Sequence, residues 1–442
     1  MTANTFHLGW FLEGSSAQAW GQEYTGHIGR DWMKPDLVVD IARSLERAGF
    51  DYLLMEDASW VPDTYGSSMD LYLENAIATP RQDPAMLAAV ISQATSRLGI
   101  VSTLGTFAYP PYHLARLVGT LDQVSNGRIG WNVVTGSSDG AAQNFSLDAM
   151  PEHDNRYERA DEYLDVVKRL WASWEPDAIV ADRSSGVFAD SSKVHTIDHA
   201  GEYYSVRGPL NSGPAPQGRP VIAQAGGSPA GKAFAARHAD TIVTMAKGVE
   251  EMKKYRDEIR SLMVENGRNP NDCKVLFLTS PVVGSTEADA AERRRLRFSE
   301  GMEQAATRMM SQLAKITNID FSVYDLDQPL DTIDFTTNGH QQMLGNFTKR
   351  AGTKPDATLR EIAASMYGEA SIDFTGTPDS VAAQMNEVME EVGGDGFLLL
   401  SYHVSRRHLA EITEGLVPEL QRRGLVRKEY GHTMFRDNLL EF

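Results

Sequence analysis

Little in the sequence ties the chain to an oxidising compartment, a membrane or nucleic acid. Cys273 is the single cysteine among 442 residues, so no disulfide can form within the chain, and a reducing cytoplasm is the expected location. No apolar run reaches the ~18 residues that a membrane-spanning helix needs. The N-terminal residues lack the basic segment and apolar core of a secretory signal, so we expect none. Positive charge is also scarce: 42 Lys and Arg against 60 Asp and Glu leave a net charge of −18, which argues against nucleic acid as a partner.

The chain does contain enough apolar material for a large core. Hydrophobic residues make up 42% of it, which excludes a disordered or collagen-like protein. Short apolar runs alternate with helical patterns, which is typical of α/β proteins. The runs expected to form strands are 6–11, 52–55, 98–103, 129–134, 221–225, 241–245, 275–283 and 396–400. Eight such strands predict one (β/α)8 barrel over residues 1–442. A doubly wound sheet is the alternative, although no G-x-G-x-x-G follows the first strand.

Start and stop signals place several of the intervening helices. Asp83 followed by Pro84 is a typical N-cap and first helical residue, and Pro35 and Gly49 bound another helical pattern. The helical patterns cover 35–49, 83–99, 156–171, 229–238, 249–267 and 380–392.

Two long segments interrupt the repeat. Residues 175–219 are rich in Pro, Gly and aromatics, and residues 286–375 join a charged helix over 287–316 to an irregular segment. Long insertions in barrels usually cover the C-terminal face, where active sites lie. We therefore expect both to cap that face, with 286–375 as a candidate lid; a dimerisation helix or a disordered segment is the alternative for the second.

The segment QAGGSPAG, residues 224–231, is the most specific local pattern. It joins a strand to a helix through a Gly-Gly turn, with Ser228 at the N-cap position and Pro229 next. Exposed N–H groups and the helix dipole make such a start an anion site, typically for phosphate. An ordinary, well-capped strand-to-helix turn is the other interpretation.

A second polar group occurs in EHDNRYERADEY. His153 and Tyr157 are four residues apart, so both lie on one face if the helix begins early enough, and they could bind a phosphate or a polyol. A solvated histidine at a helix start is the alternative. The chain has no H-E-x-x-H and no Cys/His cluster, so we expect no metal site.

The order of these motifs resembles a known family. Three segments are similar to those of bacterial-luciferase-like flavin monooxygenases. They are GWNVVT at 130–135, HDNRYERADEY at 153–163 and QAGGSPAG at 224–231. Within that family the chain looks most like the nitrilotriacetate monooxygenase component A group. The resemblance covers nearly the whole chain and implies a luciferase-like TIM barrel.

The resemblance also implies a cofactor and the residues that hold it. FMN would be the cofactor, arriving reduced from a separate NAD(P)H-dependent flavin reductase, with O2 as co-substrate. The positions that match the family's FMN-binding residues are Asp57, Thr103, Asn132, His153, Tyr157, Gly227 and Ser228. The independent anion-site interpretation of residues 226–228 agrees with a phosphate there.

Catalytic residues and substrate are less constrained. Candidates at the barrel mouth are Glu13, Tyr109 and His403. The chain reads STLGTFAYPPYHLARL where many relatives carry an acidic residue before Pro-Pro, so Phe107 and Tyr109 form a different wall there. The substrate of one relative therefore does not carry over.

The leading functional hypothesis is a two-component monooxygenase that uses reduced FMN and O2 to oxidise and cleave a small organic substrate. A flavin-degrading oxygenase of the riboflavin lyase type is an alternative on the same scaffold, and a flavin storage protein without turnover is another. Reduction by a deazaflavin is a further, weaker alternative. We expect a homodimer or higher homo-oligomer.

Overall fold

The computed structural model describes residues 5–13, 20, 26–297, 301–350, 356–368, 370–400 and 405–442. Within them, eight parallel strands close into a barrel in the order β1-β14-β11-β10-β9-β4-β3-β2. This confirms the predicted (β/α)8 architecture over the doubly wound sheet. The barrel strands are β1 (His7–Leu12), β2 (Tyr52–Met55), β3 (Gly99–Gly105), β4 (Ile129–Val134), β9 (Val221–Gln224), β10 (Thr241–Thr244), β11 (Lys274–Thr279) and β14 (Gly396–Leu400).

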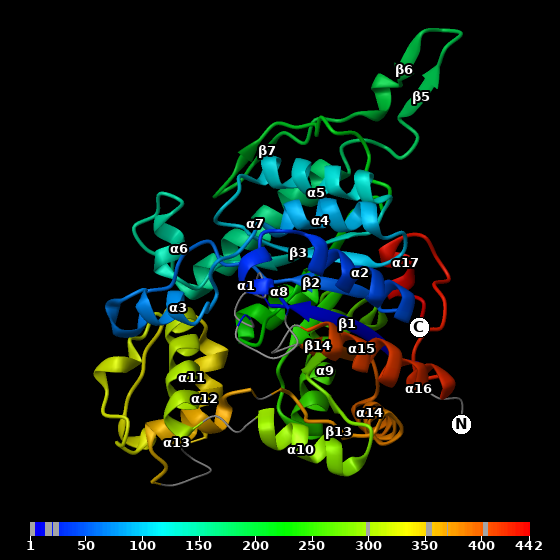
Figure 1. Ribbon diagram of the computed structural model, residues 1–442. Coiled ribbons are helices and arrows are strands. Elements are labelled where there is room, and N and C mark those ends of the chain that lie inside the picture. The colour runs from blue at the N-terminus through cyan, green and yellow to red at the C-terminus, as the bar shows by residue number, and fades with distance from the viewer. Residues whose placement is uncertain are drawn as a thin grey trace.

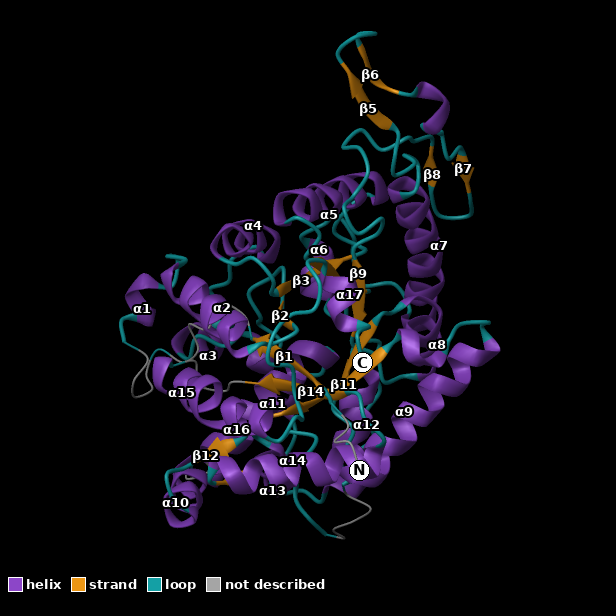
Figure 2. Cartoon of the chain, turned by 90° about the vertical axis from the view of Figure 1, so that its right-hand side faces the viewer, coloured by secondary structure: helices purple, strands orange, loops and turns teal. Residues whose placement is uncertain are grey.

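Helices surround the barrel in the alternating order that the hydrophobic pattern predicts, and Figure 2 shows them outside the strands. Each buries an apolar stripe against the sheet, because all-parallel sheets need both faces covered. They are α2 (Asp36–Ala48), α4 (Pro84–Ala94), α5 (Pro111–Ser125), α7 (His153–Trp171), α8 (Pro229–His238), α9 (Gly248–Glu265), α14 (Pro378–Val392), α15 (Arg406–Ala410) and α16 (Val417–Arg422). Short helices α1 (Ile28–Asp31), α3 (Asp70–Glu74) and α6 (Asp139–Gln143) lie in the connecting loops. No described helix is long and apolar enough to cross a membrane.

The end of the barrel where the strands begin is closed. The C-terminal helix α17 (Phe435–Leu439) packs Phe435 and Leu439 against inward-facing strand residues such as Val101. A Cβ added to Gly99 would lie 2.5 Å from the Phe435 ring, so a glycine allows this close approach. Access to the interior is therefore from the opposite end, where the strands finish.

The second insertion forms a compact unit at that open end. Its helices are α10 (Glu287–Arg297), α11 (Met302–Thr317), α12 (Gln341–Lys349) and α13 (Leu359–Met366), and strands β12 (Val282–Val283) and β13 (Thr375–Gly376) pair at its base. The prediction of one helix over 287–316 is wrong, because Gly301 is the N-cap of a separate helix. A second apolar core inside the unit surrounds Phe321 and Phe347. Figure 1 shows α11 below α3, with α12 and α13 packed beside α11.

The first insertion lies elsewhere. It leaves α7 at the end where the barrel strands begin, so it packs along α5 and α7 rather than over the open face. The Gln123 side chain donates to the Ser212 carbonyl at 2.6 Å, and Tyr203 N–H donates to Glu162 at 2.9 Å. Its two hairpins are β5 (Ile179–Asp182) with β6 (Val187–Ala189), and β7 (His199–Ala200) with β8 (Ser205–Val206). Figure 1 shows the β5–β6 hairpin projecting away from the barrel.

Candidate functional site

Thr103 and Asn132 lie side by side inside the open end of the barrel. They are paired neighbours on β3 and β4, and the Asn132 amide donates to Thr103 Oγ1 at 2.9 Å. The third strand extends two residues past Thr103 to Gly105, so this threonine lies inside the strand rather than at its end. Asn132 is 6% exposed, and among the described residues its Oδ1 has no hydrogen-bond partner. A buried unpaired acceptor is costly unless a ligand donates to it.

The Gly-Gly turn opens α8 as the sequence predicts. Ser228 is the N-cap, its Oγ accepts from Gly231 N–H at 3.1 Å, and Pro229 is the first helical residue. Added Cβ atoms would lie 2.5 Å from the Gln224 amide at Gly226 and 2.9 Å from the Tyr157 hydroxyl at Gly231. The glycines thus keep open a small cradle bounded by polar side chains and helix N–H groups, which is suited to an anion.

His153 and Tyr157 reach this cradle from α7. The helix begins at His153, so the two residues share one face, and their rings lie 5.3 Å apart. His153 is only 7% exposed, which contradicts the interpretation as a solvated histidine, and its Nδ1 lies 2.7 Å from the Asp154 carboxylate. Burial raises the pKa of Tyr157, while a hydrogen bond with Ser228 opposes that rise. A neutral phenol is a hydrogen-bond donor at every physiological pH.

The acidic pair after β2 divides into two environments. Glu56 forms an ion pair with Arg81 at 3.3 Å. Burial alone would raise the pKa of Glu56, but the charge of Arg81 helps to hold this pKa below its ordinary value. Burial raises the pKa of the neighbouring Asp57 to about 6, and the charge of Asp83 adds to the rise. Burial and these two aspartates raise the pKa of Tyr109 to about 12. Asp57 and Tyr109 therefore form a corner of the mouth where both side chains stay protonated to a higher pH than they would in water.

The three candidate catalytic residues lie in different places in the structure. Tyr109 belongs to the corner beside Asp57. Glu13 directly follows β1 and is half-buried. His403 lies outside the described residues.

An aromatic wall faces the mouth between β3 and β4. Phe107, which the sequence placed there, stacks edge-on against Phe145 with centroids 5.5 Å apart. A Cβ on Gly136 would meet Met150 at 2.6 Å, and one on Gly140 would meet Trp60 at 2.5 Å. Met150 and Trp60 were missed, and the small residues after β4 are the only local signal for them.

The second insertion contributes residues that sequence reasoning also missed. The Gln342 amide lies against the Gly-Gly turn, because a Cβ on Gly227 would fall 1.7 Å from it. The neighbouring Asn338 carbonyl accepts from Arg156 of α7 at 2.9 Å. These positions are more than a hundred residues from the turn and from α7, so no local pattern could reveal them.

Other chemistry-bearing residues stay apart from this region. Cys273 is buried and its pKa is raised by burial, as expected for a packed thiol. His195 pairs with Glu175 at 2.8 Å, and His199 pairs with Glu162 at 2.9 Å.

The described residues fit a phosphorylated flavin. The glycine cradle beside Tyr157 and Ser228 would take a phosphate, and the unpaired Asn132 Oδ1 would accept from a ring N–H. The two regions are joined through adjacent strands, because Asn132 on β4 neighbours Ala223 on β9, one residue before Gln224.

Known proteins share this architecture. The sequence profile of the luciferase-like monooxygenases matches residues 7–396. A dibenzothiophene-sulfone monooxygenase from Rhodococcus erythropolis (strain XP) is 36% identical over 98% of this chain and 96% of its own length. Nitrilotriacetate monooxygenase component A from Aminobacter aminovorans is 33% identical over 90% of this chain and 88% of its own length. A crystal structure of riboflavin lyase with modified FMN and the substrate riboflavin is 30% identical, with a TM-score of 0.87 over 99% of this chain and 96% of that chain.

These similarities confirm the resemblance that the motifs carry. The match extends across nearly all of the barrel and both insertions, at identities that establish common descent. The chain belongs to the luciferase-like family of flavin-dependent monooxygenases.

Proposed function

We propose that the protein is the oxygenase component of a two-component monooxygenase, using reduced FMN and O2 to oxidise and cleave a small organic substrate. The observation that carries this proposal is the cradle at the start of α8, where Gly227, Tyr157 and Ser228 meet with helix N–H groups. Its combination with the unpaired Asn132 Oδ1 inside the barrel suits a ligand that has a phosphate at one end and a polar ring at the other.

Each residue then has a role in holding the cofactor. Tyr157 and Ser228 would donate hydroxyl hydrogen bonds to the phosphate, and His153 would support the ring of Tyr157 from the preceding helical turn. Thr103 orients the Asn132 amide so that Oδ1 is free to accept from the flavin ring. Bound reduced FMN supplies two electrons and two protons, so that one oxygen atom of O2 enters the substrate and the other leaves as water.

The protein's own contribution is positioning and proton control. The aromatic wall of Phe107, Phe145 and Trp60 would pack against an apolar or planar substrate and keep water out of the mouth. Asp57, with its pKa near 6, is the group best suited to hold or release a proton at the mouth near neutral pH. The related component A protein supports a separate NAD(P)H-dependent flavin reductase as the partner.

A stopped-flow experiment tests the proposal. Anaerobic protein with reduced FMN is mixed with air-saturated buffer, alone and with a panel of small organic compounds, and 18O-labelled O2 is followed into products by mass spectrometry. We expect the protein to alter the rate of flavin reoxidation, and one compound to accelerate it and gain one 18O atom. Reoxidation identical to that of free FMN, with no labelled product, would exclude the function.

A second candidate is oxidative cleavage of a flavin. It is favoured by the similarity to riboflavin lyase over nearly the whole chain and by an aromatic wall that suits a second planar ring. Adding riboflavin as the substrate and measuring lumichrome by chromatography separates the two candidates. Formation of lumichrome would identify riboflavin as the substrate, and its absence leaves the first proposal.

We also propose that the protein forms a homo-oligomer. Four apolar side chains lie exposed on the projecting β5–β6 hairpin, and Phe188 is 66% exposed. They are Ile179, Val180, Val187 and Phe188. Light scattering should give a mass above one chain, and Phe188→Ser should lower it if the hairpin carries the contact.

A further inference from the structure

The second insertion reaches the start of α8 through the side chain of Gln342. Gln342, the second residue of α12, lies so close to Gly227 that an added Cβ would fall 1.7 Å from Cδ, 1.8 Å from Oε1 and 2.1 Å from Nε2. The amide of Gln342 is therefore at the same turn that holds Ser228 as N-cap. Its position places a donor of the insertion beside the anion cradle of the barrel.

The N-terminal end of α12 lies near the Gly-Gly turn. His340 is the N-cap of α12, and its Nδ1 accepts from Met343 N–H at 3.2 Å, which fixes the first turn. Burial lowers the pKa of His340, and the charges of His153 and Arg156 lower it further. The imidazole is thus held neutral beside the cradle, where it can serve as cap while the helix dipole favours an anion.

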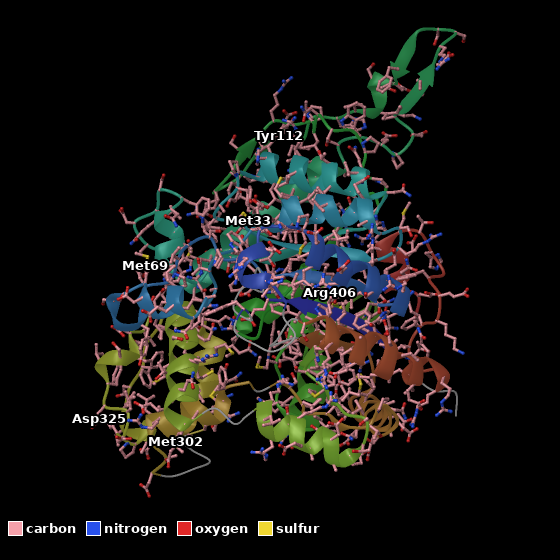
Figure 3. The ribbon with its side chains drawn as sticks, viewed as in Figure 1. Met33, Met69, Tyr112, Met302, Asp325 and Arg406 are labelled. Carbon is pink, nitrogen blue, oxygen red and sulfur yellow. The ribbon has the colours of Figure 1, made fainter. Side chains whose placement is uncertain are left out.

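Hydrogen bonds hold this part of the insertion in place. Asn338 donates to the carbonyls of Met150 and Pro151 at 2.9 and 3.1 Å, and accepts from Arg156 Nη2 at 2.9 Å. Farther along the same unit, Asn318 donates to Ser137 O at 2.9 Å. Figure 3 marks the extent of the unit, with Met302 and Asp325 at its outer end. The end near the cradle is tied to the barrel loops at several points.

Two buried polar groups near this place lack partners within the described residues, which points to a ligand. Arg156 is 4% exposed, its Nη1 and Nη2 bond only to backbone carbonyls, and its Nε has no partner among the described residues. No carboxylate of the described part of the chain forms an ion pair with it. A buried cation without a counter-ion is costly. The Gln224 amide beside Gly226 is 2% exposed, and among the described residues its Oε1 lacks a partner. This oxygen is an acceptor, so it needs a donor group of a bound ligand beside the cradle.

We propose that Gln342 and the start of α12 form the second half of the phosphate site, facing the half made by α8. The proposal rests on the proposed flavin function and assigns a new role to the insertion. Gln342 donates its amide to the phosphate group, and the nearby Arg156 charge is balanced by it. The insertion thereby selects the phosphorylated flavin over riboflavin at the cofactor position, because riboflavin offers nothing for Gln342 to bind.

Flavin titration of two matched variants tests this role. Gln342→Leu removes the amide at nearly constant size, and Gln341→Leu makes the same change at an exposed position of the same helical turn. Fluorescence titration gives the dissociation constants of oxidised FMN and of riboflavin for each protein. For Gln342→Leu we expect about a tenfold weaker affinity for FMN, as for loss of a hydrogen bond to a charged group, with no change for riboflavin. Gln341→Leu should leave both constants as in the wild type.

The outcomes separate the two proposals. If the wild-type protein binds neither flavin, the proposed function itself fails. If it binds FMN and Gln342→Leu leaves that affinity unchanged, or weakens FMN and riboflavin equally, only the role of Gln342 is overturned. Melting temperatures of the variants identify any that do not fold.

Hydrogen exchange provides a readout that does not depend on the variants. FMN should slow amide exchange in the peptide covering 337–349 of the wild-type protein, whereas riboflavin should not. Equal protection by both flavins would mean that α12 responds to the ring rather than to the phosphate, and would overturn the proposal.

Discussion

Asp57 should make the stability of the protein depend on pH in a direction opposite to that of an ordinary surface aspartate. Its folded-state pKa is raised from 3.8 to about 6, chiefly by burial. Below pH 3.8 the carboxyl is protonated in both folded and unfolded chains, so it costs nothing. As the pH rises through 6 the folded protein must carry a buried charge that the unfolded chain carries in water. Stability is therefore lost as the pH rises through this window.

The magnitude follows from the size of the shift. Two pKa units correspond to about 3 kcal/mol of unfolding free energy when Asp57 is fully ionised. About 2 kcal/mol of that cost arises between pH 4.5 and 7.5, because part of it is already present at pH 4.5. With an unfolding entropy of about 2 cal/mol/K per residue, a chain of 442 residues converts this into about 2 °C of melting temperature.

Asp57→Asn removes the charge and keeps the shape, so the difference in melting temperature between variant and wild type isolates this group. We expect the difference, variant minus wild type, to rise by about 2 °C from pH 4.5 to 7.5. Differential scanning fluorimetry in one set of buffers measures it, and other carboxylates cancel. Asp63→Asn, at an exposed position of the same loop, is the control and should give a flat difference. A flat difference for Asp57→Asn as well would refute the reasoning.

Four further substitutions address cofactor binding and stability. Tyr157→Phe and Ser228→Ala should each weaken FMN about tenfold and spare riboflavin, because each removes one hydroxyl bond to a charged phosphate; equal losses in fluorescence titrations would contradict this. Asn132→Leu should weaken the affinity for both flavins, because Oδ1 is proposed to face the ring rather than the phosphate. A loss of affinity for FMN alone would contradict this contact with the ring. Arg427→Met should lower the melting temperature by about 3–5 °C, since it strips a buried ion pair from Asp51, with flavin affinity unchanged; an unaltered melting temperature would show that the pair contributes nothing.

The barrel could be predicted because its signals are local. The run 129–134 is apolar enough to be buried on both faces, and the strand has those bounds. Asp83 with Pro84, and Ser228 with Pro229, determine where two helices begin, and both helices begin there. The residues predicted to bind FMN came from the family resemblance, and among them Gly227 and Ser228 also belong to a local pattern, the Gly-Gly turn at a helix start.

Other features were misjudged because a local pattern admits two structures. The predicted helical patterns do not include α5, although it begins at Pro111 and a proline is well suited to the first turn of a helix. Gly301 within 287–316 was treated as an ordinary helical residue, although it caps a second helix. The contact of Arg156 with Asn338 spans 182 positions, and neither residue carries a periodicity that would indicate the other.

Asp51 and Arg156 are two buried charges with different sets of partners. At the closed end, Asp51 lies between His7 at 2.8 Å and Arg427 at 2.6 Å, and accepts the Leu8 N–H at 2.9 Å, so the charge of this carboxylate is balanced. At the open end, Arg156 is equally buried but bonds only to carbonyls within the described residues. A bound ligand supplies the partner that a buried polar group lacks within the chain. In the site that we propose, the phosphate of the flavin is this partner for Arg156, and residues of the insertion as well as of the barrel hold it.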